Sequence, residues 1–334
     1  MIDKTIPHTS LYAPDLSPTK RLPSGALFKF LVSINELGRA TVPQLADWLG
    51  LNVDYARQML MLLKPKKDGT GGFISVLPVT SRKYQRRGSV PPVYTLNARG
   101  REYMRLQGLS VPRRFKASER VCKPHTLAVN QVLTLARVLE RQNPWVKLAA
   151  FRHEQYLIER PMWIPLTKTQ TVGLSPDLWL DFRGTTSGRF TFCVEVNLTE
   201  VTEKVWRNKI RAYLHCLPVY KRMFGTAVLQ VVVICATREN FPKRETPFES
   251  RSEALLIRGP QAKERWQRVQ NLKLWTEKEL THQNATEDAD MFLFTDFALD
   301  RATAKQLFVN QNFLRPNSTY SYPLLKRKGG QTHA

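Results

Sequence analysis

The sequence predicts an α/β protein in which a small helical module precedes a larger domain built on a central mixed sheet. The chain has 334 residues, a comfortable length for two domains. Hydrophobic residues make up 42% of it, which is enough for well-packed cores. Segments with helical periodicity alternate with continuous apolar segments typical of strands covered on both faces.

Three short helices and a β-hairpin are expected first. Residues 26–37 have apolar side chains at helical spacing and stop before a glycine. Thr41 and Asn52 are suitable N-caps for the next two helices. Two β-rich segments, 71–79 and 91–97, then flank a strongly basic stretch, and a closing helix follows. This order is that of a winged helix-turn-helix, which we place at 24–108.

A winged helix binds DNA through its third helix and its hairpin. The third helix lies in the major groove, while basic side chains of the hairpin face phosphates or the minor groove. A solvated loop is the structural alternative for the hairpin. The expected DNA contacts are Tyr55, Arg57 and Gln58 on the helix and Arg82, Lys83, Arg86 and Arg87 on the hairpin.

The charge of the chain points to a polyanionic partner. Lys and Arg number 51 against 28 Asp and Glu, leaving a net charge of +23, and both halves of the chain are basic. Such a charge is usually balanced by nucleic acid, which releases counterions on binding. We therefore expect double-stranded DNA as the partner. No long apolar run or signal-type segment indicates a membrane or export, so we expect a cytoplasmic protein.

The larger domain is expected over 124–300. A long amphipathic helix is followed by three strand-like segments, a second helix and a continuous apolar strand, an order that predicts a central mixed sheet. The strand-like segments are 146–158, 177–182 and 189–198; the second helix is near 201–217, the apolar strand is 227–237, and a helix near 260–280 and a strand at 291–296 follow. Outside the two domains we expect an extended arm at 1–23, a basic linker at 109–123 and a loose tail at 301–334.

Acidic side chains gather near the ends of two predicted strands. Asp177 opens one strand, and Glu195 and Asn197 share one face of the next because they are two residues apart. If the two strands form a hairpin, Asp177 can approach the other two. Carboxylate and amide oxygens suit Mg²⁺ or Mn²⁺, ions that bridge phosphate oxygens in phosphoryl transfer. The sequence thus predicts a metal-dependent phosphodiesterase site.

Lys209 lies within the apolar arc of the helix near 201–217. A buried ammonium must reach the edge of the protein or meet an anion, and Glu195 and a bound phosphate are the candidate partners. We therefore expect Asp177, Glu195 and Lys209 to be the catalytic residues. Each of the three strand residues also has a structural alternative: Asp177 can form a turn, Glu195 can pair with an arginine, and Asn197 can cap the next helix.

These residues resemble the signature of the PD-(D/E)xK nucleases, in which an acid is followed by Glu-x-Lys on the next strand. Asn197 stands in the place of the lysine, and the resemblance implies that Lys209 fills that role. More specifically, residues 25–235 resemble the replication-relaxation family of plasmids and integrative elements, which includes MobC-type relaxases. The corresponding positions are His125, Asn130, Pro176, Asp177, Glu195, Asn197, Thr199, Glu200, Lys209 and Tyr213.

The resemblance implies recognition of an origin of transfer or replication, with metal-dependent nicking of one strand and with other mobilisation or replication proteins as partners. Asn197 replaces the family's second acid, so we expect weaker metal binding. Two alternatives stay open: a non-catalytic DNA-binding protein with a decayed nuclease fold, and a dimeric endonuclease that cuts both strands. His125 and Tyr213 fit structural packing slightly better than direct catalytic roles.

Overall fold

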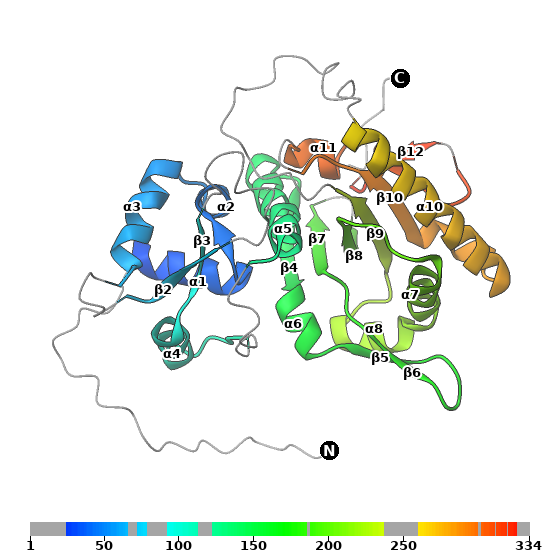
Figure 1. Cartoon of the computed structure of the whole chain (residues 1–334), viewed down its shortest axis with the longest axis horizontal. Helices are drawn as coiled ribbons and strands as arrows, with labels where there is room; N and C mark the ends of the chain where they lie inside the picture. Colours follow the sequence, from blue (N-terminus) through cyan, green and yellow to red (C-terminus); the bar gives the residue numbers. More distant parts are fainter. Residues whose placement is uncertain are drawn as a thin grey trace.

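The chain forms two modules that lie side by side, and the long helix α5 runs between them (Figure 1). The computed structural model describes residues 25–65, 72–78, 92–112, 122–185, 188–236, 260–299, 302–310, 312–318 and 320–325. The expected arm at 1–23 and the four basic hairpin residues, Arg82, Lys83, Arg86 and Arg87, lie outside these ranges.

The N-terminal module consists of four helices and a small antiparallel sheet in the order β1-β3-β2. Thr41 caps α2 in a reciprocal capping box with Gln44, and the Asn52 side chain caps α3. Both helix starts are therefore where the sequence predicts them. The elements are α1 (Ala26–Leu37), β1 (Ala40–Thr41), α2 (Val42–Leu49), α3 (Val53–Leu63), β2 (Ile74–Leu77), β3 (Val93–Leu96) and α4 (Ala98–Leu106).

The second module is built on a seven-stranded mixed sheet in the order β12-β11-β10-β9-β8-β7-β4. Strands β8, β9 and β10 are parallel, and the other neighbouring pairs are antiparallel. The strands are β4 (Val146–His153), β7 (Leu178–Gly184), β8 (Gly188–Asn197), β9 (Gln230–Cys235), β10 (Phe292–Asp296), β11 (Phe313–Leu314) and β12 (Ser321–Tyr322). The helices are α5 (Pro124–Gln142), α6 (Glu154–Glu159), α7 (Glu203–His215), α8 (Leu217–Phe224), α10 (Pro260–His282), the 3-10 helix η3 (Thr286–Met291) and α11 (Ala304–Phe308).

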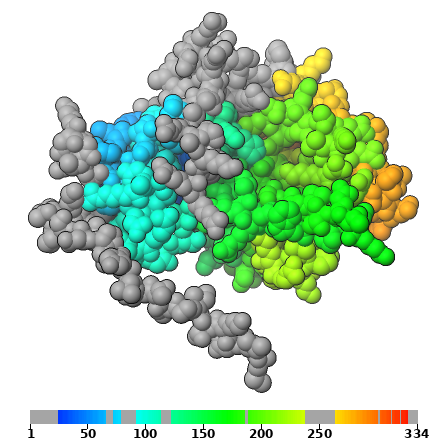
Figure 2. All heavy atoms as spheres, turned by 60° about the horizontal axis from the view of Figure 1, so that its bottom comes forward, coloured from blue at the N-terminus to red at the C-terminus, as the bar shows by residue number. Residues whose placement is uncertain are grey.

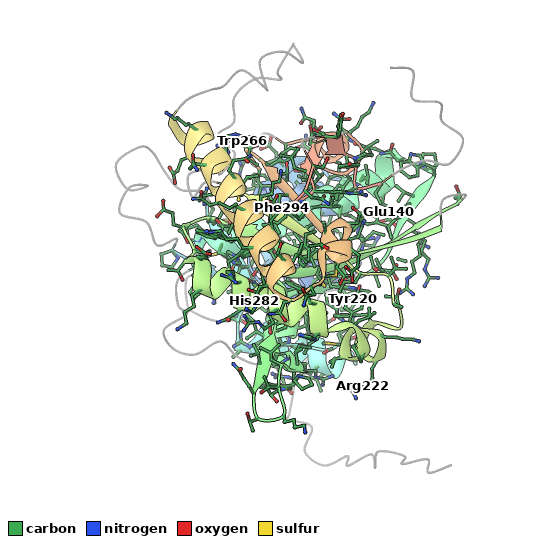
Figure 3. All side chains as sticks on the ribbon, turned by 90° about the vertical axis from the view of Figure 1, so that its right-hand side faces the viewer. Glu140, Tyr220, Arg222, Trp266, His282 and Phe294 are labelled. Atoms are coloured by element: carbon green, nitrogen blue, oxygen red, sulfur yellow. The ribbon has the colours of Figure 1, made fainter. Side chains whose placement is uncertain are left out.

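Helices cover both faces of the sheet. Along β8 the side chains alternate, so Val194 and Val196 face the core shared with α5, α11 and the N-terminal module, whereas Cys193 faces the core under α7, α8 and α10. Figure 3 shows α10 lying across the outer side of the sheet, with β10 and Phe294 behind it. No helix in the described ranges has the length and apolar character needed to cross a bilayer.

Three features of the second module differ from the expectation. The strand expected over 146–158 ends at His153, whose side chain caps α6 by accepting a hydrogen bond from the Gln155 amide at 3.4 Å. A separate hairpin, β5 (Met162–Pro165) and β6 (Thr171–Leu174), follows it. The helix expected near 201–217 is α7, and an additional helix that the sequence analysis did not expect, α8, begins directly after it at Leu217 with a proline in its first turn.

Within the loose tail expected at 301–334, the described residues between 302 and 325 form regular elements. Helix α11 packs against α5, and β11 and β12 extend the sheet beyond β10. Buried apolar side chains such as Phe308 and Phe313 explain this, since they join the common core. The composition of the segment, rich in Pro, Asn and Ser, conceals these few buried positions.

Buried hydrogen bonds join the two modules. Asn130 of α5 has no exposed surface, and its amide donates to the carbonyl oxygens of Leu37, at 3.1 Å, and of Arg39, at the end of α1. Gln155 of α6 donates to the Asn35 carbonyl at 3.0 Å. The apolar cores are also continuous across this boundary, and the space-filling view shows the two modules side by side (Figure 2). The modules therefore meet through a packed and hydrogen-bonded interface.

Candidate functional site

The hairpin of β7 and β8 brings Asp177 to the end of β8. Leu178 pairs with Val194, so the backbone amide of Asp177 donates to the Val194 carbonyl at 3.1 Å. The amide of Val196 in turn donates to Asp177 Oδ2 at 2.8 Å. The carboxylate is therefore fixed beside the last residues of β8, where Glu195 and Asn197 lie.

His125 links this carboxylate to a second one. The imidazole extends from the first turn of α5, and its Nε2 lies 3.2 Å from Asp177 Oδ2 and 3.1 Å from the Val196 carbonyl oxygen. Its Nδ1 lies 3.2 Å from Glu154 Oε2 in the first turn of α6. Thr126 donates to the other oxygen of Glu154 at 2.7 Å. The ring thus bridges Asp177 and Glu154.

Both ring nitrogens of His125 face acceptors, an arrangement that favours the imidazolium. Burial alone would lower the pKa of His125, but the negative charges of Asp177 and Glu154, together with their hydrogen bonds to the ring, raise it to about 11. Burial tends to raise the pKa values of Asp177 and Glu154, yet the contacts with His125 hold both below their usual range. The proton on His125 is thus the cation that these two carboxylates hold, and another cation could replace it.

These three side chains could hold a metal ion. One ligand atom from each of His125, Glu154 and Asp177 lies within 4.8 Å of the other two, as first-row divalent ions require. Binding would require His125 to release a proton, because a ligating imidazole nitrogen must carry a free lone pair. The donor set of one nitrogen and two carboxylates fits a divalent cation chemically.

Glu195 points from β8 toward α7, on the face of the strand opposite that of Val194 and Val196. One carboxylate oxygen accepts a hydrogen bond from Lys209 Nζ and the other from the hydroxyl group of Tyr213. Burial raises the pKa of Glu195 to about 7, although Lys209 opposes the shift. The negative charges of Glu195 and Asp177 outweigh burial at Lys209 and raise its pKa. Lys209 therefore contacts one of its two expected partners.

Asn197 is held from the outer helix layer. Arg268 of α10 donates to Asn197 Oδ1 at 3.1 Å and to the carbonyl oxygen of Ala236 at 2.6 Å. The arginine is only 4% exposed and forms no ion pair with a carboxylate in the described ranges. Asn197 thus supplies a neutral acceptor to a buried cation, and its amide oxygen already has a partner.

The predicted site residues fall into separate groups. Lys209 and Tyr213 contact Glu195, and Asp177 lies near enough for its charge to act on both Glu195 and Lys209. Asn130 lies instead in the interface between modules, where His153 Nε2 contacts its Oδ1 at 2.7 Å. The three helix residues expected to contact DNA are exposed on α3, in the other module: Tyr55, Arg57 and Gln58.

Sequence reasoning missed Glu154 and Arg268. Glu154 was hidden in an apolar segment interpreted as one continuous strand. The only local signal was the adjacent pair His153-Glu154, because a strand buried on both faces has no place for two such polar side chains. Arg268 gave no comparable signal, since basic residues lie on both sides of it in α10: Lys263 and Arg265 before it, Lys273 and Lys278 after it.

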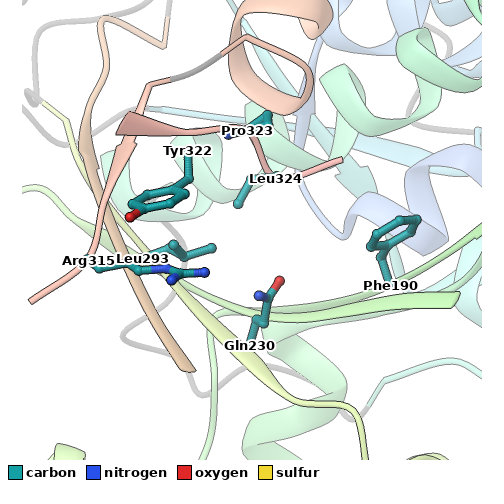
Figure 4. A pocket seen from close by; sticks show the side chains of 7 residues that line it. All are labelled: Phe190, Gln230, Leu293, Arg315, Tyr322, Pro323 and Leu324. Carbon is teal, nitrogen blue, oxygen red and sulfur yellow. The ribbon is translucent and has the colours of Figure 1, made fainter. Parts of the chain in front are cut away.

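A pocket of about 200 Å³ lies away from these acids (Figure 4). Its wall includes Phe190, which is five residues before Glu195 on β8 and so roughly 16 Å from it along the strand. Arg315 in this pocket already pairs with Asp290 at 2.6 Å and stacks over the ring of Tyr322. The pocket therefore offers no unpaired charge and takes no part in the acidic site.

Comparisons with known proteins agree with this organisation. The model of the family described as Replication-relaxation matches residues 31–225, more than half of the chain. The matched range includes most of the N-terminal module, all of α5 and the acids at the strand end. No curated protein and no solved structure matches the chain.

Proposed function

Because the chain belongs to the replication-relaxation family, we propose that it acts on DNA at an origin of replication or transfer of a mobile element, and that it nicks one strand there with the help of a divalent metal ion. The observation that carries the proposal is the meeting of Asp177, Glu195 and Lys209 with His125 and Glu154 at one strand end.

The N-terminal module would provide the DNA-binding surface. The order α1, β1, α2, α3, β2 and β3, with β3 between the other two strands, is that of a winged helix. Its third helix is exposed, as a recognition helix must be. The net charge of +23 supplies attraction to phosphates that depends on salt but not on base sequence.

The second module would provide the cutting site. The succession α5, β4, β7, β8, α7 and β9, with acids at the start of β7 and the end of β8, supports a PD-(D/E)xK-like fold. Mg²⁺ or Mn²⁺ would be held by Asp177 with Glu154 and His125, and the imidazole in this set favours Mn²⁺. When bound, the ion would act as a Lewis acid toward a phosphoryl oxygen.

Side chains of the protein would accept the proton, stabilise the developing negative charge and hold the acids in position. Glu195, with a pKa of about 7, can accept a proton from an attacking water near neutral pH. Lys209, cationic beside it, can donate a hydrogen bond to a phosphate oxygen as negative charge develops there. Asp177 would hold its position through the Val196 amide, so that the acids keep a fixed geometry.

The test is relaxation of a supercoiled plasmid carrying DNA of the element that encodes the protein. We expect open-circular product with Mn²⁺ or Mg²⁺ and none with a chelator. Asp177→Asn and Glu195→Gln should each lower the rate by about 100-fold, since each removes a charge used in the transition state. Glu203→Gln, an acid of α7 paired with Arg207 outside the cluster, is the matched control and should retain the wild-type rate. Absence of nicking by the wild-type protein with either ion would refute the catalytic proposal.

A non-catalytic role is the second candidate, and one observation favours it. Each acid in the cluster already has partners: His125 for Asp177 and Glu154, and Lys209 and Tyr213 for Glu195. Such a cluster can simply stabilise the fold of a DNA-binding replication protein. In that case Asp177→Ala and Glu195→Ala would leave both DNA binding and replication of the element intact.

A further inference from the structure

The outer face of α3 has an unusual composition for a surface that would meet DNA. Ala56, Leu60 and Leu63 point into the core, and the opposite side is exposed. We define the α3 outer face as Asp54, Tyr55, Arg57, Gln58, Met61 and Leu62. Met61 is 59% exposed, Leu62 65% and Tyr55 40%, although apolar side chains of this size are usually covered.

This face has little to offer to phosphates. Its one cation, Arg57, is paired with Asp54 at 2.6 Å one turn away on the same helix. Surfaces that contact the DNA backbone instead carry unpaired lysines and arginines. The charge that attracts DNA must therefore come from other parts of this basic chain, and the α3 outer face must have another role.

The same side chains fit the edges of A·T base pairs in the major groove. Thymine presents its 5-methyl group there, which apolar side chains contact, while adenine presents the N6 and N7 atoms that a glutamine amide binds in a bidentate manner. Gln58 and Leu62 are four residues apart and Met61 is beside them, so all three lie on one side of the helix. The face thus combines one adenine-reading amide with two methyl-covering side chains.

A second copy of the chain fits this face less well. The face contains a charged pair, whereas the cores of protein interfaces are depleted of charged residues, and it lies on a single helix, which the major groove of DNA can admit. Figure 1 shows α3 at the far side of the N-terminal module from the sheet, where a duplex could reach it. Its composition and its place on a single helix therefore favour DNA over a protein partner.

We propose that α3 selects thymine-rich DNA, with Met61 and Leu62 covering thymine 5-methyl groups and Gln58 binding an adjacent adenine. The inference rests on the proposed DNA binding and adds its sequence preference. It assigns to Met61 and Leu62 a role in specificity, next to the groove contacts expected of Tyr55, Arg57 and Gln58.

The test begins by selecting bound duplexes from a random pool with the full-length protein. The tightest duplex is then remade with uracil in place of thymine, which removes only the 5-methyl groups. We expect thymine-rich selected sequences and an affinity about fourfold lower for each methyl group that the side chains cover. Met61→Ser and Leu62→Ser should each reduce the difference in affinity between the thymine duplex and the uracil duplex. Leu106→Ser, an equally exposed apolar position on α4, should leave the difference unchanged.

The possible outcomes separate this inference from the proposed function. Equal affinity of the wild-type protein for thymine and uracil duplexes would refute methyl recognition and leave DNA binding intact. Failure to bind any duplex would refute both. A dimer in sedimentation that Leu62→Ser dissociates, with DNA binding unchanged in that variant, would assign the face to self-association and overturn the inference.

Discussion

Two places along the β7–β8 hairpin bury acids, and they neutralise them in different ways. Asp181 of β7 is 2% exposed and accepts hydrogen bonds of 2.9 Å at each oxygen from Arg189 of β8. At the strand end, the ion pairs of Asp177, Glu154 and Glu195 within the described part of the chain are with His125 and Lys209. The first place has one base for one acid, whereas the second has more acids than bases.

This difference separates a structural ion pair from a site that can exchange cations. The bidentate geometry of Asp181 and Arg189 satisfies both partners and leaves no position for another ion. At the strand end, burial and the charge of Asp177 raise the pKa of Glu195 to about 7, and the charges of Asp177 and Glu154 raise that of His125 to about 11. Shifted groups that cluster around one point are typical of functional sites.

The largest expected effect comes from replacing each of the two aspartates, Asp181 and Asp177, with asparagine and comparing the loss of stability. Asp181→Asn should lower the free energy of unfolding by about 3 kcal/mol, because Arg189 loses the carboxylate that holds it in a bidentate pair. Asp177→Asn should cost about 1 kcal/mol, because losing a charge relieves repulsion from Glu195 while His125 keeps Glu154. Urea unfolding at pH 7 measures both, and equal losses would contradict the distinction.

A smaller effect is expected from Lys209→Met, and it should depend on pH. Glu195 has a folded pKa of about 7, above its ordinary value near 4.5, and removing Lys209 raises it further. At pH 5 the carboxyl is protonated with or without the lysine, so the variant should be nearly as stable as the wild type. At pH 8 it should be less stable by about 1–2 kcal/mol.

Urea unfolding at the two pH values measures this difference. Lys204→Met, an exposed position on the same helix, is the control and should show no dependence of this kind. A loss for Lys209→Met that is the same at pH 5 and pH 8 would show that the lysine does not act through the ionisation of Glu195.

His125→Gln should lower the stability of the protein at neutral pH and change how its stability depends on pH. The folded pKa of His125, about 11, lies above its ordinary value of 6.5, so the stability that its proton contributes is fully present below pH 6.5 and declines as the pH rises toward 11. Between pH 7 and pH 9 the wild-type protein should therefore lose stability with a slope of about one proton more than the variant. Parallel curves for the two proteins would contradict the bridging role of the imidazolium.

The smallest effect is expected from giving Arg268 an acidic partner, as Arg189 has in Asp181. Asn197→Asp would give buried Arg268 an anionic partner and should raise the free energy of unfolding by about 1 kcal/mol. Asn197→Leu, which removes an acceptor, should lower it by a similar amount. Destabilisation by Asn197→Asp would instead mean that repulsion from Glu195 dominates.

Local signals in the sequence were sufficient to predict features that depend on helix caps and on the periodicity of helices and strands. Thr41 and Asn52 start α2 and α3 through their own side chains, so the limits of these helices follow from a few neighbouring residues. The meeting of Asp177, Glu195 and Lys209 was also predictable, because strand alternation and the helical arc set the directions of these side chains.

Other features depend on packing between distant segments. Glu154 enters the site because β4 ends at His153, a break that the apolar sequence around it conceals. Arg268 becomes buried because α10 packs on β9 and β10 in one particular rotation, which its many charged residues do not reveal. Phe308 and Phe313 were overlooked because a polar segment needs few apolar side chains to add to an existing sheet.

The hydrogen-bonded boundary at Asn130 has a geometric consequence. Its amide holds the end of α1, its carbonyl oxygen accepts from His153, and the next residue along from that histidine is Glu154 of the acidic cluster. Burial lowers the pKa of His153 to about 4, so this link stays neutral and intact at physiological pH. If DNA binds as proposed, a duplex held on α3 would therefore keep a constant spacing, in base pairs, from the carboxylates.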